Sequence, residues 1–158
     1  MTSPVADAID ARLLRALIRD PRATTIALAD EINVSRNTVQ ARLARLQQRG
    51  ALRPFDRRVD PAFVGYPMQA VVLTRVKQRM LDEVAASLEQ VREVIEVQGL
   101  SGTVDLLVRV VARDADDLYR VAGQILEIKG VRRTRTALVM RGLVDYRVGQ
   151  LIDTAGGR

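Results

Sequence analysis

The sequence predicts an α+β chain of two small domains, three helices followed by a βαββαβ unit. Two patterns within the 158 residues indicate this division. Apolar residues recur at helical spacing in the first third of the chain, and from Met68 onward stretches of strand and helix character alternate. Pro and Gly separate the two patterns. We therefore expect a first domain over residues 1–60, a linker over 61–67, a second domain over 68–152 and a flexible tail over 153–158.

Two short helices are expected at the start of the chain. Apolar residues at helical spacing over 9–18 stop at the Asp20-Pro21 break. Thr24 or Thr25 can cap a second helix. Asn33 then supplies a tight corner before the next element.

A third helix is expected from an N-cap at Ser35 to about Arg49, closed by Gly50. At 100° per residue, its apolar residues fall on one side and form a core stripe. Three short helices with a turn before the third are the helix-turn-helix pattern. The stripe consists of Val39, Leu43 and Leu46.

The positive charge of the chain is concentrated in one segment. The whole chain has a net charge of +6, and residues 34–58 alone carry this excess, with seven arginines against one acid, Asp56. A solvated basic face is the ordinary interpretation of a charge cluster. However, the planar fork of arginine suits phosphate and guanine, so the clustering favours a nucleic-acid surface. The seven are Arg36, Arg42, Arg45, Arg49, Arg53, Arg57 and Arg58.

The third helix contains no acid, whereas the polar face of an ordinary surface helix usually carries Glu and Lys. Asn and Gln can bond adenine, and Arg can bond guanine. Residues 51–61 are expected to form an Arg-rich hairpin, a wing that would grip the DNA backbone. The candidate DNA-binding residues are Ser35, Arg36, Asn37, Thr38, Gln40, Ala41, Arg42 and Arg45 on the helix and Arg53, Arg57 and Arg58 in the wing.

The second domain is expected to be a ferredoxin-like split βαβ sandwich. Its apolar and β-branched residues alternate in four stretches, and two stretches between them have helical spacing. Asp114 can cap the second of these helices. Strands are expected over 69–76, 94–99, 106–111 and 131–144, and helices over 81–91 and 114–128.

The composition argues against several classes of function. Cysteine and histidine are both absent, which removes disulfides, thiolate metal sites and the commonest general base. No run of 18 apolar residues exists, and the acidic first ten residues do not look like a secretory signal. An enzyme on the second domain would have only scattered carboxylates to use. We therefore expect a cytoplasmic protein with no catalytic residues, no metal site and no cofactor.

Several stretches, in this order and spacing, carry a family resemblance over nearly the whole chain. They are 9–14, 34–46, 48–52, 59–61, Gly65, 102–107 and 130–136. With these stretches the sequence resembles the Lrp/AsnC family, the leucine-responsive or feast/famine regulators. The resemblance implies a winged helix-turn-helix followed by an effector domain of the RAM type.

The resemblance also implies partners. Members of the family bind double-stranded DNA and pair the sheets of two subunits into a homodimer, and the dimers gather into tetramers, octamers or larger discs. Amino acids or related metabolites bind between the subunits. Carried onto this chain, the effector-binding residues would be Gly99, Ser101, Gly102, Thr103, Val104 and Asp105, with Thr134 and Thr136 across the interface.

The chemistry of these residues suits a free amino acid. Backbone N–H groups around Gly102 can bind its carboxylate, and Asp105 can accept from its ammonium group. Alternatively, Gly102 makes a turn and Asp105 begins a strand. Thr134 and Thr136 alternate along a strand and would be explained by β-propensity alone.

The favoured function is a sequence-specific, oligomeric transcription regulator of the Lrp/AsnC type, associated with the nucleoid and switched by an amino acid or related metabolite. The alternative is an architectural protein that compacts DNA without an effector. The second domain would then serve only in oligomerisation.

Overall fold

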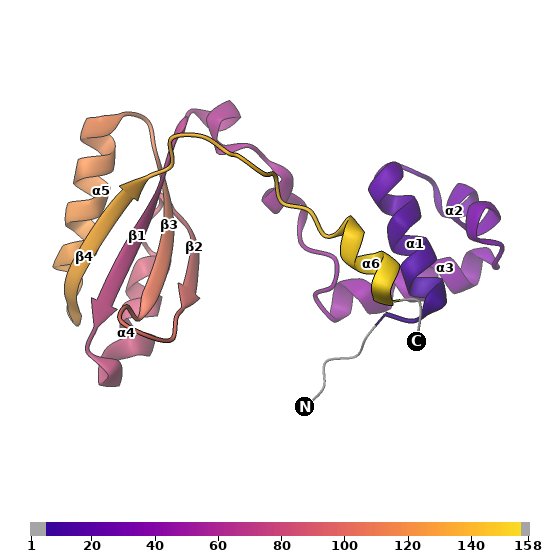
Figure 1. Cartoon of the computed structure of the whole chain (residues 1–158), viewed down its shortest axis with the longest axis horizontal. Helices are drawn as coiled ribbons and strands as arrows, with labels where there is room; N and C mark the ends of the chain where they lie inside the picture. Colours follow the sequence, from indigo (N-terminus) through magenta and orange to yellow (C-terminus); the bar gives the residue numbers. More distant parts are fainter. Residues whose placement is uncertain (1–5, 156–158) are drawn as a thin grey trace. The chain divides into compact units, whose positions relative to one another are not determined.

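The computed structural model describes residues 6–155, which form two compact units (Figure 1). Of the described residues, the first unit holds 6–57 and 144–155. The second unit spans Arg58–Leu143. Each unit has an apolar core of its own.

The three helices expected in the first unit are confirmed, and each begins at a side chain that caps it. The Asp7 carboxylate accepts from the backbone N–H groups of residues 9 and 10. The hydroxyl of Thr24 accepts at 3.2 Å and that of Ser35 at 3.1 Å from the N–H groups three residues later. These bonds satisfy donors that the first turn of a helix otherwise leaves without a partner. The helices are α1 (Ala8–Arg19), α2 (Thr25–Ile32) and α3 (Arg36–Gln48).

The corner between α2 and α3 lies at Asn33, as expected. Asn33 has φ 54° and ψ 58°, in the left-handed region that asparagine tolerates better than most residues. The next N–H, of Val34, donates to the carbonyl of Ala29 at 3.0 Å. This geometry turns the chain sharply, so that Ser35 can start α3 at once.

The core of the first unit fixes which side of α3 faces outward. Val39 is fully buried and Leu46 nearly so, and Leu43 packs against the same cluster. Their partners are apolar residues of α1 and α2, including Leu13 and Leu28. The stripe predicted for α3 is therefore confirmed, and its opposite side faces solvent.

The end of the chain differs from the expectation. The last strand stops at Leu138, and residues Gly149–Ala155 form a further helix, α6, which contacts α1. A strand continuing to residue 144 was wrong because its partner strand begins at Met68, directly after a proline that has no N–H to donate. The flexible tail expected over 153–158 stays a prediction: α6 extends to residue 155, and the last three residues lie outside the described part.

The hairpin expected over residues 51–61 was also wrong. Residues Phe55–Arg58 form a 3₁₀ turn, and a second one follows over Pro61–Val64. The N–H of Arg57 donates to the Pro54 carbonyl at 3.3 Å, a local bond that replaces any pairing between strands. Two prolines in eleven residues cannot donate to a ladder, which explains why no wing strand forms here.

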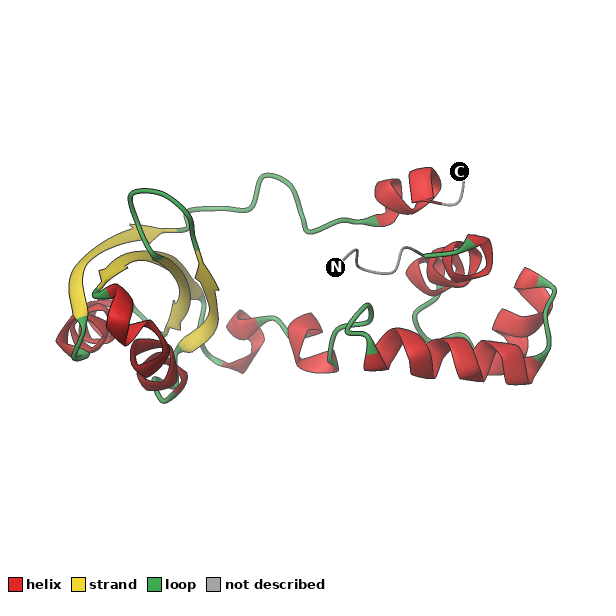
Figure 2. Ribbon diagram, turned by 90° about the horizontal axis from the view of Figure 1, so that it is seen from below, coloured by secondary structure: helices red, strands yellow, loops and turns green. Residues whose placement is uncertain are grey.

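The second unit has the expected βαββαβ order. Its four strands form one antiparallel sheet in the order β2-β3-β1-β4, which Figure 2 shows to be strongly curved. The elements are β1 (Met68–Val76), α4 (Leu81–Glu89), β2 (Val94–Gly99), β3 (Leu106–Ala112), α5 (Ala115–Glu127) and β4 (Val131–Leu138).

The two faces of the sheet differ. On one face, alternate residues such as Val72 and Val108 are fully buried and share a core with residues of α4 and α5. The residues between them, including Val71, Leu73 and Leu107, point to the other face and are only half-buried. This second face is called the open face below.

Candidate functional site

The solvent side of α3 presents small and amide side chains. Thr38 is half-buried, and its hydroxyl lies 2.8 Å from that of Ser35. Asn37 and Gln40 lie near the start of α3, the end of a recognition helix that contacts base edges. The exposed residues are Ser35, Arg36, Asn37, Gln40, Ala41, Ala44, Gln47, Gln48 and Arg49.

Two of the predicted DNA-binding arginines are engaged with α1. Arg42 Nη1 donates to Asp10 Oδ1 at 2.9 Å and also bonds the Asp7 carboxylate. Arg45 Nη2 donates to both carboxylate oxygens of Asp10, each at 2.9 Å. The Asp10 side chain is 7% exposed and that of Arg42 is 19% exposed. We call these four residues the α1–α3 clamp.

The clamp is a feature that the sequence analysis missed. It fastens α3 to α1 and leaves the side that carries Asn37 and Gln40 exposed. Arg42, expected to bind DNA, is thus bonded to two carboxylates of its own chain, a geometry that favours a role in positioning α3. Asp7 and Asp10 have the spacing of one helical turn, a weak signal that by itself does not identify a partner 32 residues away.

The clamp perturbs the ionisation of Asp7. The hydrogen bond from Arg42, helped by the N–H of residue 10, lowers the pKa of the Asp7 carboxyl from 3.8 to about 2. The same pairing raises the pKa of Arg42. Because the folded pKa of Asp7 is depressed, its stabilisation is complete above about pH 4 and is lost as the pH falls towards 2.

Asp7→Asn keeps a good capping side chain but removes the charge. We expect it to lower the free energy of unfolding by about 1 kcal/mol or less, since Asp7 is 50% exposed. The difference from the wild type should be constant from neutral pH to about pH 4 and shrink below it. Urea unfolding at several pH values measures this. A difference that does not change down to pH 3 would contradict the pairing.

The predicted wing arginines lie in different settings. Arg53 is exposed and its guanidinium carbon lies 5.5 Å from the ring centroid of Tyr146. Arg57 and Arg58 lie in the 3₁₀ turn that replaces the hairpin, and both are exposed. These residues are therefore not presented together on a strand pair.

The predicted effector loop joins β2 to β3. The N–H of Leu100 donates to the carbonyl of Asp105 at 2.8 Å, which brings the two ends of the loop together. Gly102 has φ +116°, a conformation that favours glycine, and it is exposed with Ser101 and Thr103. The loop therefore presents backbone groups to solvent.

The Asp105 side chain forms hydrogen bonds that stabilise this unit. Its carboxylate accepts from the N–H of Val76 at 2.8 Å and from Gln78 Nε2 at 2.7 Å. These bonds anchor the loop to the end of β1. An ionised carboxylate has about four acceptor sites, so an ammonium group can still be accommodated.

The two threonines lie at the other edge of the sheet. Thr134 pairs with Thr74, which pairs with Leu106, which in turn pairs with Gly99. Two whole strands thus separate Thr134 from Gly99, about 14 Å at the usual strand spacing. One chain does not bring the loop and Thr134 or Thr136 together.

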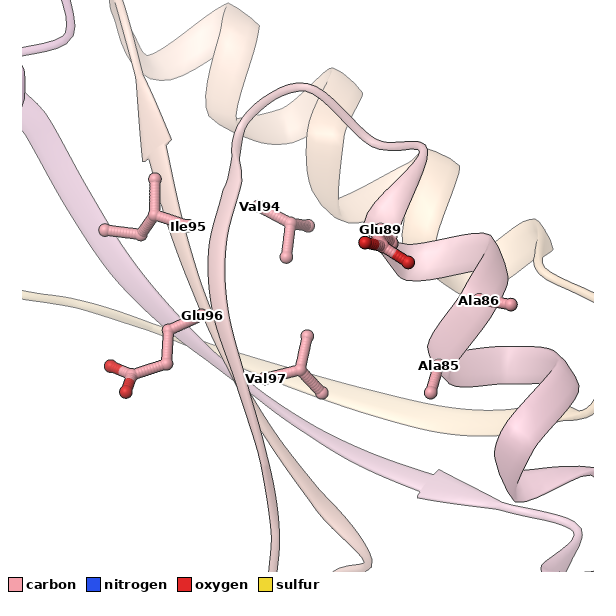
Figure 3. Close-up of a pocket in the computed structure, with 7 residues that line it drawn as sticks. All are labelled: Ala85, Ala86, Glu89, Val94, Ile95, Glu96 and Val97. Atoms are coloured by element: carbon pink, nitrogen blue, oxygen red, sulfur yellow. The ribbon is translucent and has the colours of Figure 1, made fainter. Parts of the chain in front are cut away.

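A shallow groove lies between α4 and the edge strand β2 (Figure 3). Both charged residues that line it, Glu89 and Glu96, are carboxylates, and Arg109 lies 3.6 Å from Glu96. A free amino acid needs donors for its own carboxylate, which these side chains do not supply. The groove is lined by Ala85, Ala86, Glu89, Val94, Ile95, Glu96 and Val97.

Within residues 6–155, no helix is both long and apolar enough to cross a membrane. The same part of the chain holds no group of three or more acidic residues placed to bind a metal ion.

Family profiles match both units. An AsnC-type helix-turn-helix domain matches residues 7–47, which include α1, α2 and nearly all of α3. An Lrp/AsnC ligand binding domain matches residues 69–148, which include nearly the whole sheet and both of its helices.

Named relatives extend over most of the chain. The HTH-type transcriptional regulator AldR of Mycobacterium tuberculosis is 31% identical over 141 residues, 87% of this chain and 79% of the relative. The HTH-type transcriptional regulator FL11 of Pyrococcus abyssi is 30% identical over 135 residues, 85% of this chain and 89% of the relative.

Solved structures share the fold. The leucine response regulatory protein LrpA of M. tuberculosis has a TM-score of 0.79 at 28% identity, covering 90% of this chain and 98% of its own. A feast or famine regulatory protein of M. tuberculosis, complexed with L-methionine, has a TM-score of 0.77 at 29% identity and covers 89% and 95%. Escherichia coli AsnC has a TM-score of 0.79 at 24% identity, covering 92% and 99%. The chain belongs to the Lrp/AsnC family of transcription regulators.

Proposed function

We propose that this regulator recognises a specific DNA sequence through the exposed side of α3. One observation carries the proposal: the side of α3 held outward by the clamp bears Asn37, Gln40, Ala41 and Ala44 and no acid. The alanines allow close approach to a groove, and the two amides match adenine. Arg36 and Arg49 are exposed at the two ends of α3 and would contact phosphates.

A mobility-shift assay in a salt series tests DNA binding. The full-length protein is titrated into duplex DNA from upstream of its own gene, at several salt concentrations between about 50 and 200 mM. The logarithm of the affinity should fall linearly with that of the salt concentration, by about 0.9 per phosphate contact. Absence of a shift at the lowest salt, or an affinity independent of salt, would contradict the proposal.

We further propose that the protein acts as a homodimer that pairs through the open face, and that dimers assemble further. Val71, Leu73 and Leu107 leave a half-buried apolar strip there, which a second sheet would cover. Two recognition helices on adjacent half-sites would multiply the affinity of one.

Leu73→Asp should disrupt this pairing with little effect on the core, because the side chain points away from α4 and α5. Light scattering during size-exclusion chromatography should show a shift from the assembled to the monomeric mass. The matched control is Leu126→Asp on α5, which is 49% exposed on the helical side. The same mass for wild type and Leu73→Asp would exclude the open face as the interface.

The effector is proposed to be an amino acid or a related metabolite, bound between subunits at the loop 99–105 and Thr134 or Thr136 of a neighbour. The L-methionine complex of the M. tuberculosis relative supports this class of ligand. The two sets of residues are separated across the sheet, and Thr134 and Thr136 pair with Thr74 and Val72 on the face opposite the open face, so the proposed site would be completed by a subunit other than the one that pairs through the open face.

Thermal unfolding in the presence of each of the twenty amino acids should identify the effector. A ligand at 100 times its dissociation constant stabilises by about 2.7 kcal/mol, which raises the melting temperature by several degrees. Gly102→Val should abolish the shift, because valine is strained at φ +116°. A response within error of zero for all twenty would favour an assembly-only domain.

The second candidate is an architectural protein that compacts DNA without an effector. The exposed arginines of residues 34–58 would serve this function equally well. Compaction does not require base reading, however, so it would not explain the exposed amides of α3. Both candidates act on chromosomal DNA, so we propose a cytoplasmic, nucleoid-associated location.

A further inference from the structure

The chain returns to its DNA-binding unit after completing the sheet. Residues 144–155 belong to the same compact unit as α1, α2 and α3. Helix α6 contacts α1 there, and a Cβ placed on Gly149 would lie 3.8 Å from Ile18 Cδ1, an ordinary van der Waals distance. The helix-turn-helix alone, residues 7–47, does not include this element.

A second contact of the C-terminal segment 144–155 joins Tyr146 to Arg53, which lies shortly after α3. The guanidinium carbon of Arg53 lies 5.5 Å from the ring centroid of Tyr146. The backbone before Arg53 is fixed, since the N–H of Ala51 donates to the carbonyl of Leu46 at 2.9 Å and Leu52 packs against the core of the unit. Arg53 therefore lies five residues after the end of α3, on a backbone that is tied to that helix, and its guanidinium lies over an aromatic ring.

This cation–π contact is compatible with a bond to phosphate, because a guanidinium has five N–H donors. The ring attracts the positive charge of the guanidinium, whereas phosphate binds its N–H groups. The ring of Tyr146 restricts the conformations of the Arg53 side chain before DNA binds. Less conformational entropy is then lost when Arg53 binds a phosphate. Tyr146 would thus prepare Arg53 for a phosphate without competing for the N–H groups.

Helix α6, in the same C-terminal segment 144–155, affects α3 indirectly, through α1. Helix α6 packs on α1, and the two acids of the clamp are Asp7, which caps α1, and Asp10, which lies on it. By stabilising the position of α1, α6 therefore also stabilises the orientation of α3.

We propose that the C-terminal segment 144–155 is a working part of the DNA-binding unit, in which Tyr146 positions Arg53 for a DNA phosphate and α6 braces α1. The proposal rests on DNA binding by α3. It adds a positioning residue and a structural element that lie about a hundred residues after the helix-turn-helix in sequence.

The test compares full-length Tyr146→Ala, Tyr146→Phe and Arg53→Ala in the salt-series assay. Tyr146→Ala should weaken binding about two- to fivefold, the worth of an exposed cation–π contact, and Tyr146→Phe should restore wild-type affinity because it keeps the ring. Arg53→Ala should also reduce the salt slope by about 0.9 per subunit. The double variant Arg53→Ala/Tyr146→Ala should bind no more weakly than Arg53→Ala.

Tyr119→Ala is the matched control, since this tyrosine is 84% exposed on α5 in the other unit. Wild-type affinity for Tyr146→Ala, or additive losses in the double variant, would overturn the positioning role. A chain ended after Val148 tests the brace: amide exchange should rise in α1 and not in β1 and β3. Unchanged exchange in α1 would overturn the bracing role.

These outcomes separate the inference from the proposed function. A wild-type protein that does not bind DNA defeats the proposed function itself. A wild-type protein that binds DNA and is indifferent to Tyr146 and α6 defeats only the inference.

Discussion

Asp10→Ala is expected to loosen the recognition helix and to abolish tight DNA binding. The Asp10 carboxylate lies 2.9 Å from both Arg42 and Arg45 and is 7% exposed, so its removal leaves two guanidinium groups without their shared partner. Breaking a fully buried ion pair costs roughly 3–5 kcal/mol. We expect about 2–3 kcal/mol here, because Arg45 is 37% exposed and can be solvated.

The measurements are urea unfolding and amide exchange. Exchange should accelerate in α3 and α1, whereas the strands of the second unit should keep their protection. Asp30→Ala is the matched control, since Asp30 is an exposed acid of α2 and the same charge is removed. Equal stability of the Asp10 and Asp30 variants would show that the clamp does not hold α3.

Replacing both Asn37 and Gln40 by Ala is expected to remove sequence discrimination while leaving general DNA affinity intact. Each bidentate contact to a base contributes roughly 1–3 kcal/mol of discrimination. The double variant should therefore bind the specific duplex at least about tenfold more weakly. Neither residue is charged, so the salt slope and the affinity for unrelated DNA should stay at wild-type values.

Competition assays with specific and unrelated duplexes measure this ratio. Both side chains are exposed, so the melting temperature should not move. Gln90→Ala in the second unit removes an exposed amide of the same type and should leave the ratio unchanged. A double variant that discriminates as well as the wild type would place the reading residues elsewhere.

Local signals in the sequence were sufficient for most of the fold. Thr24 and Ser35 each cap a helix through a bond within three residues, and the stripe of Val39, Leu43 and Leu46 follows from helical period alone. Strand alternation likewise predicted the βαββαβ order. Such features are visible in one sequence because they depend on neighbours a few residues apart.

The features that sequence could not supply are long-range. Asp10 and Arg42 are 32 residues apart, and nothing near either residue specifies the other. Helix α6 is only seven residues long, and its contact with α1 joins the two ends of the chain. A helix this short is marginal by itself and forms because it packs, so its local pattern is weak.

The effector residues are an intermediate case. The positive φ of Gly102 and the loop closure agree with a turn that exposes backbone donors. The carboxylate of Asp105 is used to anchor β1, which the sequence could not reveal because Val76 and Gln78 lie 29 and 27 residues away. The proposed site takes residues from two subunits, so one chain alone does not complete it.

The central claim is that the outward side of α3 reads DNA sequence, and footprinting on the DNA upstream of the protein's own gene tests it most directly. Sequence reading by paired helices predicts discrete protected half-sites about one helical turn apart, at concentrations that leave flanking DNA accessible. Uniform protection along the fragment at every concentration would contradict the claim and would favour the architectural protein.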